Sequence, residues 1–118
     1  MTLGVASTRE SMALHFASIA THFAYHSASP ATTANQLGSR AAITWDSVTT
    51  VTVLPGTSTP ANKLDAANVS IALAASTAAP IGAYWSASTA GTMRQEVTLN
   101  IPAGSARNVD TDPAYYQA

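Results

Sequence analysis

The sequence predicts a mainly β protein, a small antiparallel β-sandwich or barrel with one N-terminal α-helix. Several short segments alternate apolar and polar residues, as half-buried strands do. Turns rich in Ser, Thr, Asn, Gly and Pro separate these segments at the close spacing of a small all-β domain. A helical period occurs only near the N-terminus. With 118 residues and no internal repeat or linker, the chain is expected to form one domain, residues 1–118.

The first element is predicted to be a helix over residues 8–20. Ser7 and Glu10 have the spacing of a capping box, in which each side chain satisfies a free backbone N–H of the first turn. From Thr21 the period changes to two, which predicts a strand up to His26. The apolar residues that recur at helical spacing, and that we expect to share the buried helix face, are Met12, Phe16, Ile19 and Phe23.

The β-domain is expected to span residues 21–107. In its last predicted strand, apolar residues alternate with polar ones such as Arg94, Glu96 and Thr98. We expect loops at Thr32–Gly38, Thr57–Asn62 and Ser86–Thr92. The other strands are predicted at Arg40–Asp46, Val48–Leu54, Asn68–Ala74, Ile81–Trp85 and Met93–Ile101, the last with Met93, Val97, Leu99 and Ile101 on one face.

The two ends of the chain show no clear period. We expect an N-terminal arm over residues 1–7 and a C-terminal tail over residues 108–118, both outside the β-domain. Because tyrosine is enriched in interface cores, the tail is a candidate for contact between subunits, and deletion of Asp112–Ala118 is expected to leave the domain folded. The candidate partner contacts are Thr2, Leu3, Val5, Asp112, Pro113, Tyr115 and Tyr116.

The composition favours a protein that is covered by neighbours. Only 9% of the residues are charged and the formal net charge is −1, whereas about a quarter of a typical soluble domain is charged. A surface of Ser, Thr, Asn and Ala costs little to desolvate. A secreted, weakly charged β protein would have the same composition. The scattered cationic residues predict no nucleic-acid partner, and no apolar segment is continuous enough to predict a membrane span or a secretion signal.

Residues for catalysis or metal binding are sparse. His22 and His26 have a spacing typical of two ligands on a helix, but on a strand their Cα atoms would lie about 13 Å apart. We therefore expect solvated or hydrogen-bonding histidines, no metal and no cofactor. The chain has no cysteine and no nucleophile elbow, and its carboxylates are isolated apart from Asp110 and Asp112. The prediction is that the protein is not an enzyme; a hydrolase would need His22 or His26 to pair with an acid.

Three aromatic residues allow two interpretations. Trp45, Tyr84 and Trp85 would form a sugar-stacking platform if they were exposed on one face. In a chain with so few large apolar residues, we expect them to fill the core. The segment Asn68–Ser70 matches a glycosylation acceptor, but it lies in a predicted strand and is interpreted as structural.

The stretch from His22 to Trp45 resembles small phage virion proteins of the tail-fibre or head-fibre type. The turn Tyr25–Pro30 is similar to the Leu-His-Thr-Ala-Asp-Pro turn of that family, with Ser29 in place of its acidic residue. The Thr32–Gly38 loop and the Ala41–Trp45 strand follow in the family's order, and Ile81–Ala87 is similar to a later strand. The family has no catalytic residues to transfer, so the resemblance implies a fold and a structural role.

The resemblance and the composition together predict a structural protein of a tailed-phage virion. We expect a homo-oligomer located in the virion and made in the host cytoplasm, with the major capsid protein or tail proteins as partners. A capsid decoration or minor capsid role and a tail or fibre role remain open. The alternative is a carbohydrate-binding module or adhesin domain, which would display two or more exposed aromatic residues on one face.

Overall fold

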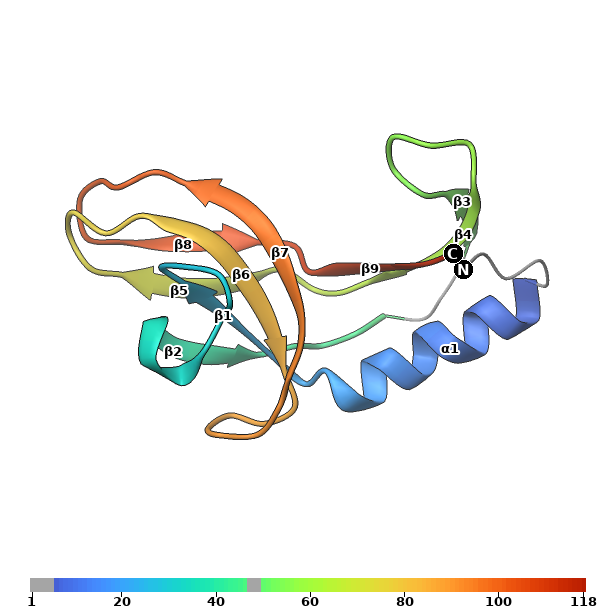
Figure 1. The fold of residues 1–118 in the computed structure, drawn as a ribbon, viewed down its shortest axis with the longest axis horizontal. Helices are drawn as coiled ribbons and strands as arrows, with labels where there is room; N and C mark the ends of the chain where they lie inside the picture. Colours follow the sequence, from blue (N-terminus) through green and yellow to red (C-terminus); the bar gives the residue numbers. More distant parts are fainter. Residues whose placement is uncertain (1–5, 47–49) are drawn as a thin grey trace.

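The computed structural model describes residues 6–46 and 50–118. The fold is mainly β with one N-terminal helix and antiparallel sheets, as predicted (Figure 1). The elements are α1 (Ala6–Ile19), β1 (His22–His26), a 3₁₀ turn (Thr33–Asn35), β2 (Gln36–Ala42), β3 (Thr50–Val53), β4 (Pro60–Asp65), β5 (Val69–Leu73), β6 (Ala79–Trp85), β7 (Met93–Ile101), β8 (Arg107–Thr111) and β9 (Ala114–Gln117).

Two of the sheets form a small sandwich. The first has the strand order β2-β1-β6-β7, and the second pairs β5 with β8. Phe23, Tyr25 and Tyr84 from the first sheet pack into one core with the alternating apolar residues of β5. Gly82 makes this packing possible, because a Cβ there would lie 2.5 Å from the Phe23 ring. The ring therefore lies directly over the backbone of β6.

The third sheet and the helix extend from the sandwich as an arm, which we define as α1, β3, β4 and β9 (Figure 1). The molecule is accordingly elongated, with extents of 45 × 28 × 24 Å. Phe16 of α1 stacks on Tyr115 of β9, with ring centroids 4.0 Å apart. The Phe16 ring also meets Tyr84 edge-on at 5.5 Å. The core of the arm is thus continuous with the core of the sandwich.

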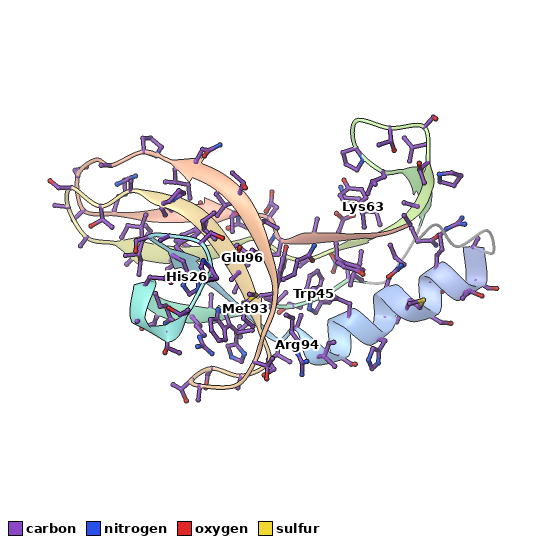
Figure 2. The ribbon with its side chains drawn as sticks, in the orientation of Figure 1. His26, Trp45, Lys63, Met93, Arg94 and Glu96 are labelled. Atoms are coloured by element: carbon purple, nitrogen blue, oxygen red, sulfur yellow. The ribbon has the colours of Figure 1, made fainter. Side chains whose placement is uncertain are left out.

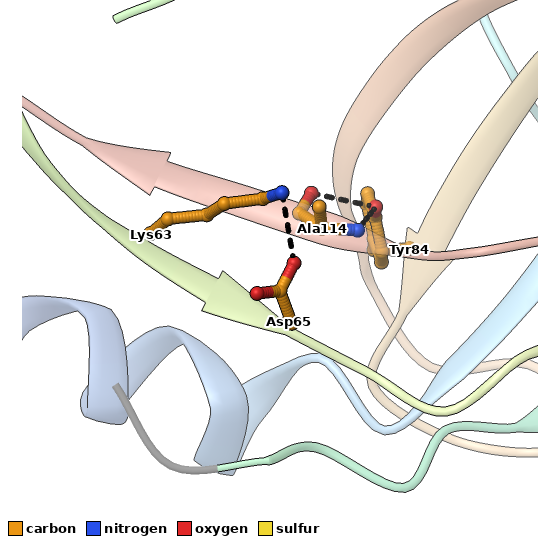
Figure 3. A network of polar contacts seen from close by, with 4 residues as sticks. All are labelled: Lys63, Asp65, Tyr84 and Ala114. Atoms are coloured by element: carbon orange, nitrogen blue, oxygen red, sulfur yellow. Dashed lines mark hydrogen bonds and ion pairs between the residues drawn. The ribbon is translucent and has the colours of Figure 1, made fainter. Parts of the chain in front are cut away.

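A pair of hydrogen bonds fastens the arm to the sandwich (Figure 3). The Tyr84 hydroxyl donates to the carbonyl oxygen of Ala114 at 2.9 Å and accepts from the Ala114 N–H at 3.1 Å. Ala114 begins β9, so both of its backbone groups are satisfied by a side chain of β6. Nearby on β4, Lys63 and Asp65 form an ion pair at 3.0 Å.

The helix spans Ala6–Ile19, against a prediction of residues 8–20, and its buried face differs from the predicted one. Met12 is 45% exposed, and the helix packs through a face that includes Arg9 and Phe16. On this face Arg9 donates to the Asn62 side-chain oxygen at 3.0 Å, which satisfies a buried polar pair. Ser7 lies within the helix, so its prediction as the N-cap is wrong. The residues buried against the rest of the fold are Arg9, Ala13, Phe16 and Ala20.

The strand predictions at Asn68–Ala74, Ile81–Trp85 and Met93–Ile101 are confirmed, with one change of face. A register shift at Tyr84 and Trp85 places Met93 beside Trp85, whereas Val97 and Leu99 pack on the main core. An extra residue in one strand of a pair turns the following side chain to the other face. Met93 therefore does not share a face with Val97.

Two predicted loops are partly strands. β2 begins at Gln36, inside the segment predicted as a loop, and ends at Ala42. Ile43 and Trp45 nevertheless share a side, as predicted, and both pack on the main core. β4 begins at Pro60, because proline is tolerated at the first position of a strand. The predicted strand Val48–Leu54 corresponds to β3, and residues 47–49 lie outside the described part of the chain.

The C-terminal segment is part of the fold. Residues 107–111 form β8 against β5, and residues 114–117 form β9 against β4, so the prediction of a separate tail is wrong. Pro113 is buried between the two strands, and Asp112 accepts a hydrogen bond from Asn68. Each strand is too short to show a period. Deletion of this segment is accordingly expected to unfold the arm.

Substitution of Tyr115 should show whether the C-terminal segment is packed in the fold or is a free tail. Tyr115→Ala is expected to lower the free energy of unfolding by about 2 kcal/mol, because it removes the ring that stacks on Phe16. Tyr116→Ala is the matched control, since the Tyr116 ring lies near Lys63 and not on α1. Its expected cost is below about 1 kcal/mol. Urea unfolding followed by circular dichroism measures both; equal costs would contradict the assignment.

Candidate functional site

Two regions contain the residues that the sequence analysis singled out. One is a polar cluster at the sandwich end of the molecule, in which Asn35, Arg40 and Glu96 surround the buried side chains of His26 and Trp85. The other is a groove on the arm between α1 and β9. Figure 2 shows His26 and Glu96 within the sandwich and Trp45 toward the helix.

His26 is fully buried and has both ring nitrogens occupied. Trp85 Nε1 donates to His26 Nε2 at 3.1 Å, and His26 Nδ1 lies 2.8 Å from the Asn35 side-chain oxygen. Because an indole N–H can only donate, Nε2 must accept and the proton must be on Nδ1. His26 is therefore a neutral imidazole in this arrangement, and burial lowers its pKa.

Asn35 connects His26 to the loop that follows β1. Its side-chain nitrogen donates to the carbonyl oxygens of Ala28 and Pro30, at 3.2 and 2.9 Å. Its side-chain oxygen also accepts from the Thr32 N–H at 2.9 Å. One amide side chain thus holds the loop closed over the outer face of the sheet. The sequence analysis missed Asn35, and its place in the polar loop after His26 is the signal that could have found it.

Arg40 and Glu96 complete the cluster from β2 and β7. The Arg40 guanidinium lies 3.8 Å from the centre of the Trp85 ring and donates to the carbonyl oxygens of Ala87 and Ala90. Glu96 accepts from the Ala31 N–H and from the Ser29 hydroxyl, and the first of these bonds is the main reason that its pKa is lowered. Both charges therefore hold loops in place.

The cluster lacks the arrangement that acid–base catalysis requires. His26 pairs with an amide and an indole, and His22 lies 2.8 Å from the neighbouring Thr21 hydroxyl. A general base needs a free lone pair within reach of its substrate, and the lone pair of His26 is used by Trp85. In residues 6–46 and 50–118, no group of three or more His, Cys, Asp or Glu side chains is placed to hold a metal ion.

The three aromatic residues considered for sugar stacking belong to the interior. Tyr84 and Trp85 are buried, at 2% and 4% exposure. Trp45 is half-buried against the core and donates to the Ala20 carbonyl oxygen at 2.7 Å. The prediction that they fill the core is confirmed. The glycosylation-like Asn68 is hydrogen-bonded to Thr111 and Asp112.

The groove between α1 and β9 is apolar and open to solvent. It encloses about 320 Å³, and Phe16 and Tyr115 contribute their stacked rings to its walls. None of its lining residues is Lys, Arg, Asp or Glu, so it offers no charge to a ligand. The lining consists of Ser11, Met12, His15, Phe16, Ile19, Tyr115 and Gln117.

The predicted partner contacts that the structure describes lie on β9 and immediately before it. Tyr115 and Tyr116 lie on opposite faces of β9, and only Tyr115 reaches the groove. Asp112 and Pro113 lie at the start of that strand, away from the groove, and Pro113 is buried. Thr2, Leu3 and Val5 lie outside the described residues. The exposed groove residues of α1 were not among the predicted contacts, and one of them, Met12, was assigned to the apolar face of the helix.

Comparisons with known proteins do not assign a function to this chain. No protein-family model matches the chain, and neither curated proteins nor solved structures include a significant match. Within the described part of the chain, no helix has the length and apolar character needed to cross a membrane.

The His26 cluster should make stability depend on pH. The unfolded chain takes up a proton below about pH 6.5, the ordinary pKa of histidine, whereas the folded protein resists it. The free energy of unfolding is therefore expected to keep its full value above that pH and to fall as the pH decreases below it. Urea unfolding at a series of pH values measures this dependence.

The variant His26→Gln tests the source of that dependence. It is expected to be less stable than the natural protein by about 1–3 kcal/mol at neutral pH, because buried partners lose a hydrogen bond. It should also lose less of its remaining stability on acidification. His22→Gln is the matched control for the loss of a histidine from the same strand. An unchanged profile in His26→Gln would contradict the assignment.

Proposed function

We propose that this protein is a structural component of a tailed-phage virion, bound in multiple copies to the capsid or to the tail. The observation that carries the proposal is an exterior nearly free of charge, combined with an open apolar groove on a projecting arm. Such a surface gains little from exposure to water and loses little when neighbours cover it.

Several of the few charged side chains are engaged within the fold. Of five Lys and Arg and six Asp and Glu residues, Arg9 is buried against Asn62 and Arg40 stacks on Trp85. Lys63 and Asp65 pair with each other, and Arg107 donates to two backbone carbonyls. Several of the few charges therefore already have partners within the chain. Packing this surface against other subunits requires few ions to be desolvated.

The exposed large apolar residues gather on the arm. Among the described residues these are Met12 and Leu14 of α1 and Val53 of β3, each 45–49% exposed. Single exposed apolar residues are ordinary on a protein surface, but these three belong to one projecting part of the molecule. The arm is thus the part best suited to contact neighbouring subunits, and the sandwich is the part left to face outward.

The residues that carry the resemblance to phage fibre-like proteins determine the fold of the sandwich end. His26, Pro30 and Asn35 belong to the closed loop, and Trp45 packs on the core. In our proposal, the resemblance reflects these fold-determining positions and not a catalytic site. The virion role is consistent with a chain whose distinctive residues all serve structure.

No observation favours the carbohydrate-binding alternative. That function needs aromatic rings exposed together on one face. Tyr84 and Trp85 are buried instead, and Trp45 is half-buried against the core. Titration with a panel of glycans is expected to leave the tryptophan fluorescence of the protein unchanged. Saturable quenching by any glycan in the panel would favour the alternative.

Mass spectrometry of purified virions tests the proposed role. Particles of the phage that encodes this chain are expected to contain it in a fixed ratio to the major capsid protein. A ratio near one would assign it to the shell, and a much smaller fixed ratio to the tail. Its presence in the infected-cell lysate together with its absence from washed particles would overturn the proposal.

A further inference from the structure

We propose that the sandwich end of the molecule binds an acidic side chain, the Asp or Glu of a partner polypeptide, with Arg40 as the cation that receives it. The site is a polar hollow beside the loop that joins β6 to β7, which projects from the sandwich (Figure 1). This hollow shares no lining residue with the groove of the arm, and the proposal does not depend on the virion role.

Two segments that are distant in the sequence build this hollow, which we call the hairpin hollow. One is the 3₁₀ turn with the start of β2, and the other is the loop between β6 and β7. The hollow encloses about 230 Å³, which is room for a carboxylate and the carbons that carry it. The described residues that line it are Thr33, Gln36, Arg40, Ser88, Thr89 and Ala90.

The fold holds the Arg40 guanidinium in place before a ligand arrives. Its Nε donates to the Gln36 side-chain oxygen at 2.8 Å. Its Nη1 donates to the carbonyl oxygens of Ala87 and Ala90, at 2.8 and 2.7 Å. The guanidinium also lies over the Trp85 ring. An anion therefore meets a cation that has little side-chain freedom left to lose on binding.

One nitrogen of this guanidinium is left for a ligand. Nη2 carries two N–H donors, and neither has a hydrogen-bond partner in the part of the chain that the structure describes. In that same part, every buried side-chain nitrogen or oxygen has a partner, so Nη2 must be reached from outside. Gln36 and Ala90 bind the guanidinium and also line the hollow, which places Arg40 at its wall.

The positive charge of Arg40 lacks an acidic partner within residues 6–46 and 50–118. No Asp or Glu side chain there forms an ion pair with it. Glu96 of the polar cluster accepts instead from the Ala31 N–H and the Ser29 hydroxyl. Burial lowers the pKa of Arg40, and no carboxylate offsets this effect. Because the fold has already removed part of the water around this cation, an anion that reaches it gains a stronger interaction than it would at an open surface.

The lining favours a carboxylate on a polypeptide over other anions. A single cation matches the single charge of a carboxylate better than the charge of a phosphate group, which is about two. One carboxylate oxygen can accept from Arg40 Nη2 and the other from the exposed hydroxyl of Ser88 or Thr89. The described lining contains no aromatic residue on which the ring of a sugar acid could stack. An acidic side chain is therefore the occupant that fits the hollow.

Heteronuclear NMR titration with two blocked peptides tests the site. The peptide acetyl-Gly-Glu-Gly-amide is expected to shift the signals of the Arg40 Nε–H and of the Ser88 and Thr89 amides together, with a Kd of about 1–10 mM. The peptide acetyl-Gly-Gln-Gly-amide is the matched control and should bind at least about tenfold more weakly, because it lacks the charge. Equal shifts with both peptides, or no saturable shift with the first, would overturn the proposal.

Two arginine variants test whether Arg40 supplies the charge. Arg40→Gln is expected to weaken binding of the Glu peptide by about tenfold or more. Arg107→Gln is the matched control, since Arg107 is also half-buried and also donates to two backbone carbonyls, but lies on β8. It should leave the Kd within about twofold. An equal loss in both variants would contradict the assignment.

A third variant keeps the test valid if Arg40→Gln loosens the loop. The double substitution Ser88→Ala and Thr89→Ala removes two exposed hydroxyls and leaves the guanidinium, so circular dichroism should show a folded protein. Binding of the Glu peptide is expected to weaken by about three- to tenfold, because the second carboxylate oxygen loses its donor. Unchanged binding in this folded variant would overturn the hairpin hollow as the site.

Two further ligands separate an acidic side chain from other anions. Inorganic phosphate and glucuronate, at the same concentration and ionic strength, are expected to bind more weakly than the Glu peptide. Tighter binding of either at the hairpin hollow would overturn the choice of an acidic side chain. A chain that binds the Glu peptide but is absent from washed virions would leave this site standing and overturn the virion role, so the two proposals fail separately.

Discussion

Tyr84 is the residue through which the two parts of the molecule hold together. Its ring meets Phe23 edge-on at 5.1 Å and Phe16 at 5.5 Å, and it stacks near Trp45 at 5.8 Å. Aromatic pairs of this kind each contribute about 0.5–1.5 kcal/mol beyond the area they bury. The hydroxyl forms hydrogen bonds with both backbone groups of Ala114. The start of β9 is therefore held against the sandwich. Burial raises the pKa of Tyr84, which keeps this hydroxyl protonated and able to donate.

The scarcity of charge has a structural origin as well as a functional consequence. At the sandwich end, a neutral histidine, an amide and an indole perform the cross-linking that ion pairs perform in other proteins. The two charges in that region, Arg40 and Glu96, are directed at backbone groups of neighbouring loops. The exterior is mostly polar with few charges, and the exposed large apolar residues of the described chain belong to the arm. The assembly role that we propose depends on this exterior.

The helix shows why an apolar period does not identify the buried face. Met12, Phe16 and Ile19 predicted the helix and its C-terminal end correctly, yet only Phe16 is buried in the chain's own core. The inner face is made by alanines, which allow close approach to the sheet, and by Arg9, which sequence patterns assign to solvent. A stripe that contacts a partner and a stripe that contacts the core have the same period. For that reason the period of Met12 and Ile19 did not reveal that they border the groove.

Local sequence determined the elements whose signals lie within a few residues of each other. The end of α1, the alternation of β5, the hairpin between β6 and β7 and the interior place of the aromatic residues all followed from period, turn chemistry and the shortage of large side chains. Only the tertiary structure decided the features that need partners distant in the chain. β9 exists because β4 and Tyr84 bind it, and His26 is neutral because Trp85, 59 residues away, donates to it. Four residues alone do not determine a strand, and the residues around one histidine do not determine its protonation. Both depend on hydrogen bonds that partners distant in the chain supply.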